Sequence, residues 1–326
     1  MAFRGRKTSR HGGERNNSWA YLFLAPALGL YLLFSVWPIF RGAAMAFTDY
    51  RFIYPDTRWD FNGLSNYREM WNDPDFWNAV RVTIRFTFYV LPFTVIISFI
   101  LAVVISKVTR LAGLYRWMIY LPVILPVAVT YLMFGELFNT KFGLINTVLR
   151  DFGMRRPPNW LNDVDYALRA ISVADIWRGV GFPTLLFLIG LYSIGSDLYE
   201  AAAVDGASGW QQLRSITLPL LKPVFALVLL LSLSSIPMTV DPMLILTGGG
   251  PRDTTMSLGL YSYKTAFQLG DLRLGYASAM NLVLGLSSAI IALLVFRSLR
   301  GDLESSGPKR RPWRRAAATA TTPVDQ

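Results

Sequence analysis

Long apolar stretches without charge recur along this 326-residue chain. Each runs for roughly 18–25 residues, which is the length of a helix that crosses a hydrocarbon core about 30 Å thick. The six stretches are Asn16–Phe40, Phe86–Ser106, Trp117–Gly135, Gly179–Ser196, Pro223–Val240 and Leu274–Phe296. Buried helices of soluble proteins rarely stay uncharged for so long. The pattern therefore predicts an all-α, polytopic membrane protein with six transmembrane helices.

The flanking residues set approximate bounds for these helices. We expect spans at Trp19–Phe40, Val80–Ser106, Tyr115–Phe138, Ala170–Ile194, Pro219–Leu246 and Leu274–Phe296. Two prolines, Pro122 and Pro126, lie inside the third span, where a proline frees backbone carbonyls and bends the helix. A gating kink and ordinary helix packing both explain them, and packing is favoured. The loop 139–168 is expected to hold a short amphipathic helix.

Composition excludes several kinds of chemistry. Hydrophobic residues make up 53% of the chain and charged residues only 16%, against about 25% charged in soluble domains. The chain has no cysteine, and its one histidine, His11, lies in the polar N-terminal segment. Disulfides, thiolate chemistry and histidine-ligated metals within the membrane are therefore excluded. We expect no catalytic residues, no metal and no cofactor.

The net charge of +11 is unevenly placed. Basic residues gather in the N-terminal tail, the loop between the second and third spans, and the C-terminal tail, whereas the opposite loops interleave basic with acidic residues. The positive-inside rule then places both termini in the cytoplasm. The basic tails could be nucleic-acid arms, but contact with an anionic membrane surface is favoured, and no nucleic-acid partner is expected.

The chain divides into a cytoplasmic tail at 1–18, a membrane domain at 19–300 and a basic cytoplasmic tail at 301–326. Both tails are expected to be disordered because they hold few apolar residues. The first apolar run is longer than the core of a signal peptide and lacks a clear cleavage site, so it is interpreted as a retained helix.

A small polar segment at 197–219 separates the fourth span from the fifth. We expect Asp197 to cap a short helix with Glu200 as its third residue, and Gly206 to end that helix in a left-handed conformation. A second short helix is expected at Ser208–Ser215, before Pro219 opens the fifth span. Capping alone would explain Glu200. The whole helix–turn–helix on the cytoplasmic face instead favours a docking element.

This segment resembles the EAA loop of permease subunits of binding-protein-dependent ABC importers. The family pattern E-A-A, two residues, D-G-A, eight residues, I-x-L-P is met without gaps by Glu200, Ala201, Ala202, Asp205, Gly206, Ala207, Ile216, Leu218 and Pro219. Further segments resemble the carbohydrate branch, in particular the maltose/glycerol-phosphate type "first" permease. They are Ala25-Pro26, Trp37-Pro38, Phe61-Asn62-Gly63-Leu64-Ser65-Asn66-Tyr67, Trp160-Leu161, Leu246-Thr247-Gly248-Gly249-Gly250-Pro251 and Tyr261-Ser262-Tyr263-Lys264-Thr265-Ala266-Phe267.

The resemblance implies the type I importer (MetI-like) permease fold in the inner membrane of a bacterial or archaeal cell. It also implies four kinds of partner: a second permease, two ABC ATPase subunits that grip the EAA loop, an extracytoplasmic solute-binding protein, and a sugar or related solute. The chain itself lacks the G-x-x-x-x-G-K-[ST] loop that cradles ATP phosphates. Hydrolysis would therefore belong to the ATPase subunits, and this chain would be a transport subunit and not an enzyme.

Two helix faces are candidates for the substrate pathway. On the fourth span, helical spacing puts Asp175, Arg178, Gly179 and Phe182 on one face. On the fifth span it does the same for Ser232, Ser235, Ile236 and Thr239. Polar groups at membrane depth face a cavity or a partner. Interhelical packing and back-bonding explain the hydroxyl groups equally well, and a mutual ion pair explains Asp175 and Arg178.

An ion-gradient-driven secondary transporter is the main alternative function. Such transporters use carboxylates at mid-membrane and are often built from inverted repeats, and neither is evident in this sequence. An intramembrane enzyme is less supported, because no paired carboxylates, histidine or cysteine lie in the spans.

Overall fold

The computed structural model describes residues 18–54, 59–108 and 110–305. Its helices are α1 Ser18–Tyr31, α2 Trp37–Met45, α3 Ser65–Asn72, α4 Pro74–Ser106, α5 Ala112–Ile124, α6 Val127–Leu137, α7 Leu144–Asp151, α8 Ala167–Gly179, α9 Gly181–Tyr192, α10 Ser196–Val204, α11 Gly209–Gln212, α12 Leu218–Leu220, α13 Lys222–Ser235, α14 Asp241–Leu246, α15 Leu258–Phe267 and α16 Leu274–Ser305. The two tails expected to be disordered lie outside the described residues, apart from Ser18 and residues 301–305, which are helical.

Four helical segments within the described residues are long and apolar enough to cross a membrane, and two bent pairs raise the number to six. The unbroken segments are Leu22–Met45, Pro74–Ser106, Lys222–Leu246 and Leu274–Ser298. The bent pairs are α5 with α6 and α8 with α9. The all-helical membrane fold is therefore confirmed, and the predicted number of six spans is reached when each bent pair counts as one broken span.

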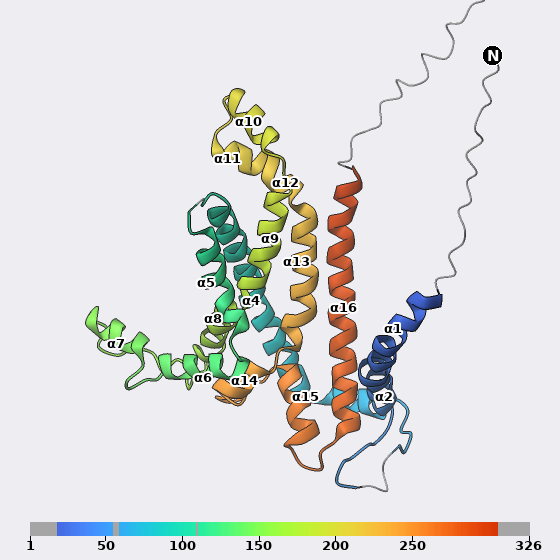
Figure 1. Cartoon of the computed structure of the whole chain (residues 1–326). Helices are drawn as coiled ribbons and strands as arrows, with labels where there is room; N and C mark the ends of the chain where they lie inside the picture. The colour runs from blue at the N-terminus through green and yellow to red at the C-terminus, as the bar shows by residue number, and fades with distance from the viewer. Residues whose placement is uncertain (1–17, 55–58, 109, 306–326) are drawn as a thin grey trace, which may run out of the picture.

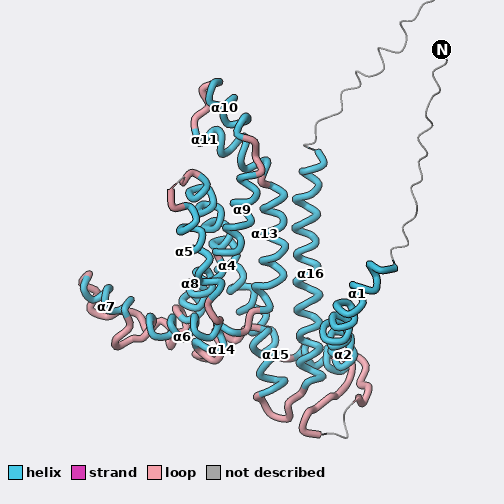
Figure 2. Tube along the Cα trace, viewed as in Figure 1, coloured by secondary structure: helices cyan, strands magenta, loops and turns pink. Residues whose placement is uncertain are grey.

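The helices stand side by side with a distinct structure at each end of the bundle (Figures 1 and 2). At one end, α10 and α11 form a small hairpin beyond the long helices; we call this the hairpin end. At the other end, which we call the far end, lie α3, α14 and α15. The long helix α16 packs on α13, and α4 packs on α9. The α1–α2 span is set apart, and none of its most apolar window is buried within the chain.

The predicted third span is wrong as a single helix. Leu125 is extended (φ −61°, ψ 140°), as expected for the residue before a proline, and helix resumes only at Val127. The axes of α5 and α6 differ by 95°. The proline therefore turns the chain sharply, and α6 and α7 extend away from the bundle at the far end (Figure 1). The short helix α7 confirms the helix expected in the loop 139–168.

The fourth and fifth spans are also less regular than predicted. A bend of 43° separates α8 from α9, next to Pro183, which has no N–H for the carbonyl of Gly179. The fifth span begins at Lys222 rather than Pro219, because α12 is a separate short turn. Helix α13 then ends at Ser235, and a 3₁₀ turn at Ile236–Met238 leads on toward α14.

The second and sixth spans are longer than predicted. Helix α4 starts at Pro74 because Asp73 is its N-cap, and the Asp73 carboxylate accepts a 2.9 Å hydrogen bond from the N–H of Asp75. Pro74 occupies the first turn, where its missing N–H costs little. Helix α16 continues to Ser305 instead of ending at Phe296.

Gly275 allows the close approach of α16 to the segment after α2. Its N–H donates a 2.9 Å hydrogen bond to the carbonyl of Tyr50. A Cβ at this position would lie 2.9 Å from the backbone nitrogen of Tyr50 and closer still to the carbonyl oxygen of Thr48. These are backbone atoms, which cannot rotate aside as a side chain would. The contact therefore requires glycine.

We expect Gly275→Ala to lower the melting temperature of the purified protein in detergent. Overpacking of this kind costs about 1–3 kcal/mol, because α16 must shift away from the Thr48–Tyr50 segment. The matched control is Gly285→Ala on the same helix, where the added Cβ would meet only the flexible end of Met238 at 3.4 Å. Equal melting temperatures for both variants would contradict the close approach.

Candidate functional site

The turn of the α10–α11 hairpin is fixed by its own backbone. Gly206 has φ +79°, the left-handed conformation that was predicted. The N–H of Gly206 donates to the carbonyl of Ala203 at 3.0 Å, and the N–H of Ala207 donates to that of Ala202 at 2.8 Å. These two bonds make a complete Schellman motif, which satisfies the last carbonyls of α10. The predicted end of this helix is confirmed.

The second arm of the hairpin starts with a capping box. The N–H of Ser208 donates to the Gln211 side chain at 2.7 Å, and the N–H of Gln211 donates to the Ser208 hydroxyl at 3.4 Å. The helix α11 continues as a π-helical segment at Leu213–Thr217. A 3.0 Å hydrogen bond between the hydroxyls of Tyr199 and Thr217 joins the two arms. The short helix expected near Ser208–Ser215 is confirmed.

The expected cap at Asp197 is wrong. The N-cap of α10 is Gly195, in an extended conformation, and no side chain caps the helix. The helix begins at Ser196 because α9 ends at Tyr192 and the chain needs only a short turn before the next helix. Asp197 lies instead within the first turn, where a carboxylate still favours the positive end of the helix dipole.

The hairpin exposes apolar side chains and unpaired carboxylates together. No residue of α10 is buried, and Val204 is 89% exposed and Trp210 69% exposed. The carboxylate of Glu200 makes no hydrogen bond or ion pair with the described part of the chain. Among the nine residues that match the EAA pattern, Ala202, Ala207, Ile216 and Leu218 are half-buried and Glu200, Ala201, Asp205, Gly206 and Pro219 are exposed. The described chain therefore leaves these apolar side chains and the Glu200 carboxylate uncovered.

The polar face of the fourth span joins another helix. The phenol of Tyr131 on α6 donates a 2.6 Å hydrogen bond to the Asp175 carboxylate on α8. Arg178 and Asp241 lie within electrostatic range of Asp175. A mutual ion pair between Asp175 and Arg178, one of the two explanations that the sequence left open, does not form within 4.0 Å. The Nε of Arg178 is buried without a hydrogen-bond partner among the described residues.

The four predicted residues of this face are divided by the bend at Val180. Asp175, Arg178 and Gly179 belong to α8, whereas Phe182 belongs to α9 and is 46% exposed. The sequence pattern assumed one straight helix, whereas these residues are divided between two helices that meet at a bend of 43°. A Cβ at Gly179 would lie 3.9 Å from the Thr94 methyl group, so this part of α8 packs close to α4.

The hydroxyl groups of the fifth span bond to their own helix. Ser235 donates to the carbonyl of Leu231 at 3.0 Å, and Thr239 donates to that of Ser235 at 3.3 Å. Ser232 is buried, whereas Ser235 is exposed. The helix ends at Ser235 and Thr239 is extended, so the single helical face predicted for these four residues is not formed. Back-bonding, which the sequence left open, is present for Ser235 and Thr239.

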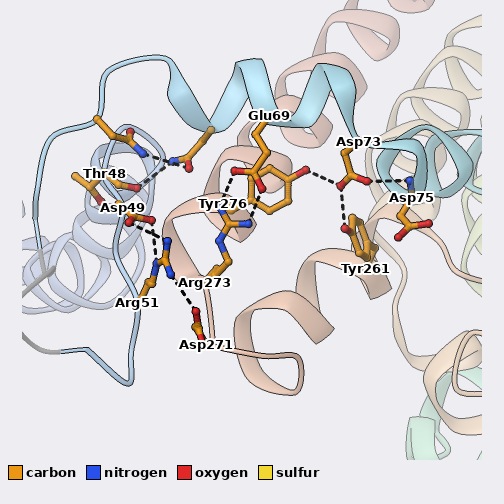
Figure 3. A network of polar contacts seen from close by, with 12 residues as sticks. Thr48, Asp49, Arg51, Glu69, Asp73, Asp75, Tyr261, Asp271, Arg273 and Tyr276 are labelled. Atoms are coloured by element: carbon orange, nitrogen blue, oxygen red, sulfur yellow. Dashed lines mark hydrogen bonds and ion pairs between the residues drawn. The ribbon is translucent and has the colours of Figure 1, made fainter.

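At the far end, a polar network that sequence reasoning missed ties the segment 49–75 to α15 and α16 (Figure 3). The Asp73 carboxylate accepts hydrogen bonds from Tyr261 at 2.9 Å and from Tyr276 at 2.7 Å. Glu69 accepts two bonds of 2.6 Å from the guanidinium of Arg273. Burial raises the pKa of Tyr261, and its bond to Asp73 raises that pKa further. The phenol therefore stays protonated and donates.

A second part of this network centres on Arg51. Its guanidinium donates to Asp49 at 3.2 Å and to Asp271 at 2.9 Å (Figure 3). Asp49 lies close to Arg51 in the chain, whereas Asp271 lies far from it, as Tyr261 does from Asp73. No local pattern in the sequence could have paired Arg51 with Asp271.

The comparison with protein families identifies the family of this chain. The profile described as "Binding-protein-dependent transport system inner membrane component" matches residues 83–300. The chain belongs to this family. The match includes the α10–α11 hairpin and five of the six spans in whole or in large part.

Named relatives of this permease cover nearly its whole length. The trehalose/maltose transport system permease protein MalF of Thermococcus litoralis is 35% identical over 88% of this chain and 96% of the relative. The lactose transport system permease protein LacF of Rhizobium radiobacter is 31% identical over 87% and 94%. The sulfoquinovosyl glycerol transport system permease protein SmoG of Agrobacterium fabrum is 32% identical over 86% and 90%.

A solved structure has the same fold as this permease. It is a bacterial ABC transporter involved in the import of the acidic polysaccharide alginate, with a TM-score of 0.76 and 22% identity over 88% of this chain and 96% of that one. The permease assignment and the expectation of a transport subunit rather than an enzyme are confirmed by the family and its relatives. Nothing in these matches supports the ion-gradient-driven alternative.

We expect Tyr131→Phe to destabilise the permease. Without the phenol, the Asp175 carboxylate loses its only hydrogen bond within the described structure, and leaving such a group unpaired costs about 1–3 kcal/mol. Thermal unfolding in detergent measures the change. Tyr115→Phe is the control, since Tyr115 on α5 is exposed and its hydroxyl makes no hydrogen bond within the described structure. A melting temperature equal to that of the wild type would show that the bond adds nothing.

Proposed function

We propose that this permease translocates a sugar or related solute inward, and that the α10–α11 hairpin couples it to ATP hydrolysis by separate ATPase subunits. The observation that carries the proposal is the exposed hairpin with its complete EAA pattern. Its backbone is closed by the Schellman motif and the capping box, so the fold holds the hairpin in shape without help from the rest of the chain. A rigid element can transmit movement from a partner to the spans.

The surface of the hairpin suits a partner with an apolar cleft and a basic group. Val204 and Trp210 offer apolar area, and Glu200 offers a carboxylate that nothing in the described chain neutralises. The small alanines at 201 and 202 allow a partner surface to approach closely. We assign Glu200, Ala201, Ala202, Asp205, Gly206, Ala207, Ile216, Leu218 and Pro219 to this coupling site.

The proposal fixes the orientation in the membrane. If ATPase subunits dock at the hairpin end, that end is cytoplasmic, and the far end receives a solute-binding protein. The N-terminal and C-terminal tails then lie in the cytoplasm, in agreement with their basic charge. The relatives that transport sugars by name favour a sugar as the solute. A second permease completes the pathway, and the resemblance to the maltose/glycerol-phosphate type "first" permease favours a different chain in that role.

We expect Glu200→Lys to abolish ATP-driven uptake with normal expression and melting temperature, because it places a positive charge against the basic group of the ATPase. Glu200→Gln should weaken ATPase association about tenfold, a loss of about 1.4 kcal/mol. Co-purification with the ATPase and uptake into proteoliposomes measure both effects. Asp151→Lys, the same change at an exposed acid on α7, is the control. Unchanged co-purification in both Glu200 variants would overturn the coupling role.

We propose further that the α8–α9 bend contributes to the substrate pathway, through Asp175, Arg178, Gly179 and Phe182. The buried and unpartnered Nε of Arg178 supports this role, since a donor without a partner needs a ligand. Phe182 supplies an exposed ring for a sugar face. Ser232, Ser235 and Thr239 of the fifth span form a weaker second part of the same proposal, since two of these hydroxyls already bond to their own helix.

We expect Arg178→Ala to raise the KM for uptake about tenfold or more, because the solute loses a hydrogen bond from a charged donor. The ATPase should still co-purify with this variant. Uptake kinetics in proteoliposomes measure the change. Ser234→Ala is the control, because Ser234 is exposed and donates only to the carbonyl of Leu230. A wild-type KM in Arg178→Ala would remove this residue from the pathway.

A further inference from the structure

A small polar cavity at the far end is distinct from the Asp175 cluster. Its volume is about 130 Å³, and its walls come from α4, the loop before α8, the start of α8 and the loop after the glycine-rich segment. The polar residues that line it are Arg85, Tyr89, Asp165, Arg169 and Thr254. We call it the mouth pocket, because Arg85 is the last charged residue of α4 before the long uncharged stretch begins.

The walls of the mouth pocket are fixed by packing and hydrogen bonds. Leu168 lines the pocket and is buried in a cluster with Phe86 and Ile171. The loop that carries Thr254 is held to α4 by a 3.1 Å bond from the Asn78 amide to the carbonyl of Asp253. Thr254 also donates a 2.7 Å bond to the carbonyl of Pro251. The pocket is therefore preformed, as ligand sites usually are.

The charged groups of the pocket have no partners within the described structure. Arg85, Arg169 and Asp165 are exposed, and no hydrogen bond or ion pair from their side chains to the described residues is formed. Guanidinium groups only donate hydrogen bonds and an ionised carboxylate only accepts them. A ligand that satisfies this set must both accept and donate within a small volume.

A sugar ring fits these requirements. Each hydroxyl group both donates and accepts, so neighbouring hydroxyls can bond to Arg and Asp at once. The planar guanidinium offers several donors in one fixed fork, and the ring of Tyr89 offers a flat surface for the apolar face of a pyranose. A simple anion would be repelled by Asp165, and a cation would be repelled by Arg85 and Arg169. The small volume suits a single ring, since pockets for whole drug-sized ligands measure about 300–1,000 Å³.

We propose that the mouth pocket binds one pyranose ring of the transported sugar before the sugar reaches the Asp175–Arg178 region. The inference rests on the proposed function, since it takes the far end as the side where the solute arrives. The hydroxyls bond to Arg85, Arg169 and Asp165, and Tyr89 stacks on the ring. The pocket would then capture the solute at the mouth of the pathway.

Single cysteines test this binding directly, because the natural chain contains none. Val164 lines the pocket and is exposed, and Asn162 is exposed in the same loop without lining it. Val164→Cys and Asn162→Cys are placed in the assembled transporter and reacted with a membrane-impermeant methanethiosulfonate reagent. Maltose, trehalose and lactose serve as probes, each with its uptake measured in parallel. A sugar that is taken up should slow labelling of Val164→Cys about tenfold at ten times its dissociation constant, and leave Asn162→Cys unchanged.

Kinetics provide a second, independent measurement. Arg85→Gln and Arg169→Gln should each raise the KM for uptake about tenfold, as expected for loss of a charge-assisted hydrogen bond, with the second permease still co-purifying. Arg81→Gln is the matched control, because Arg81 is exposed one turn earlier on α4 and does not line the pocket.

The outcomes separate the two proposals. Uptake of a sugar without protection of Val164→Cys would overturn the mouth pocket and leave the proposed function standing. A normal KM in Arg85→Gln and Arg169→Gln would also overturn it, and so would loss of the second permease from these variants, by showing that the arginines bind that subunit. Uptake of none of the three sugars by the wild type would count against the proposed sugar transport, and the pocket proposal would fall with it.

Discussion

The structure depends on one constraint of the membrane: each backbone N–H and C=O in the hydrocarbon core must find a partner within the protein. Helices meet this demand along most of the chain. A proline removes a backbone donor; the helix is interrupted at Pro126 and bent beside Pro183, whereas Pro92 lies within the unbroken α4. The breaks at Pro126 and beside Pro183, and the 3₁₀ turn at Ile236–Met238, all lie toward the far end or the middle of the bundle. The hairpin end is irregular as well, because a π-helical segment at Leu213–Thr217 and the short α12 connect the hairpin to α13.

These breaks place charged groups inside the bundle. Because α5 and α6 diverge by 95°, Tyr131 comes to lie beside Asp175 on α8. The end of α13 at Ser235 allows α14 to start nearby, and this brings Asp241 into range of the same carboxylate. A charge in a low-dielectric site is costly unless it is hydrogen-bonded or paired. Irregular helices are thus what makes a polar cluster possible in an apolar fold.

The two ends of the molecule are stabilised in different ways. The hairpin is closed by local bonds, all between residues within about one or two helical turns or across the hairpin. The far end is closed by contacts between distant parts of the chain, such as Glu69 with Arg273 and Asp73 with Tyr261 (Figure 3). A locally closed element can move as a unit while its shape is kept. A network across the chain instead holds the mouth of the bundle together. This difference agrees with the proposed function, in which the transporter is driven at the hairpin end and receives its solute at the far end.

The sequence by itself determined the helical membrane fold, the approximate spans and the hairpin. The hydropathy pattern of a span lies within one helix. The signals that define the hairpin lie within a few residues, at Gly206 and directly after it, so both can be recognised from a short stretch of sequence. It failed where geometry depends on a neighbouring helix: the angle of the break at Pro126, and the division of Asp175 and Phe182 between two helices. The predicted N-cap at Asp197 is wrong for a more local reason. Helix α10 starts at Ser196, directly after a short turn, so Asp197 lies inside the helix. The far-end network and the mouth pocket were decided only by the tertiary structure. Their residues lie far apart in the chain, and only packing of the spans brings their charges together.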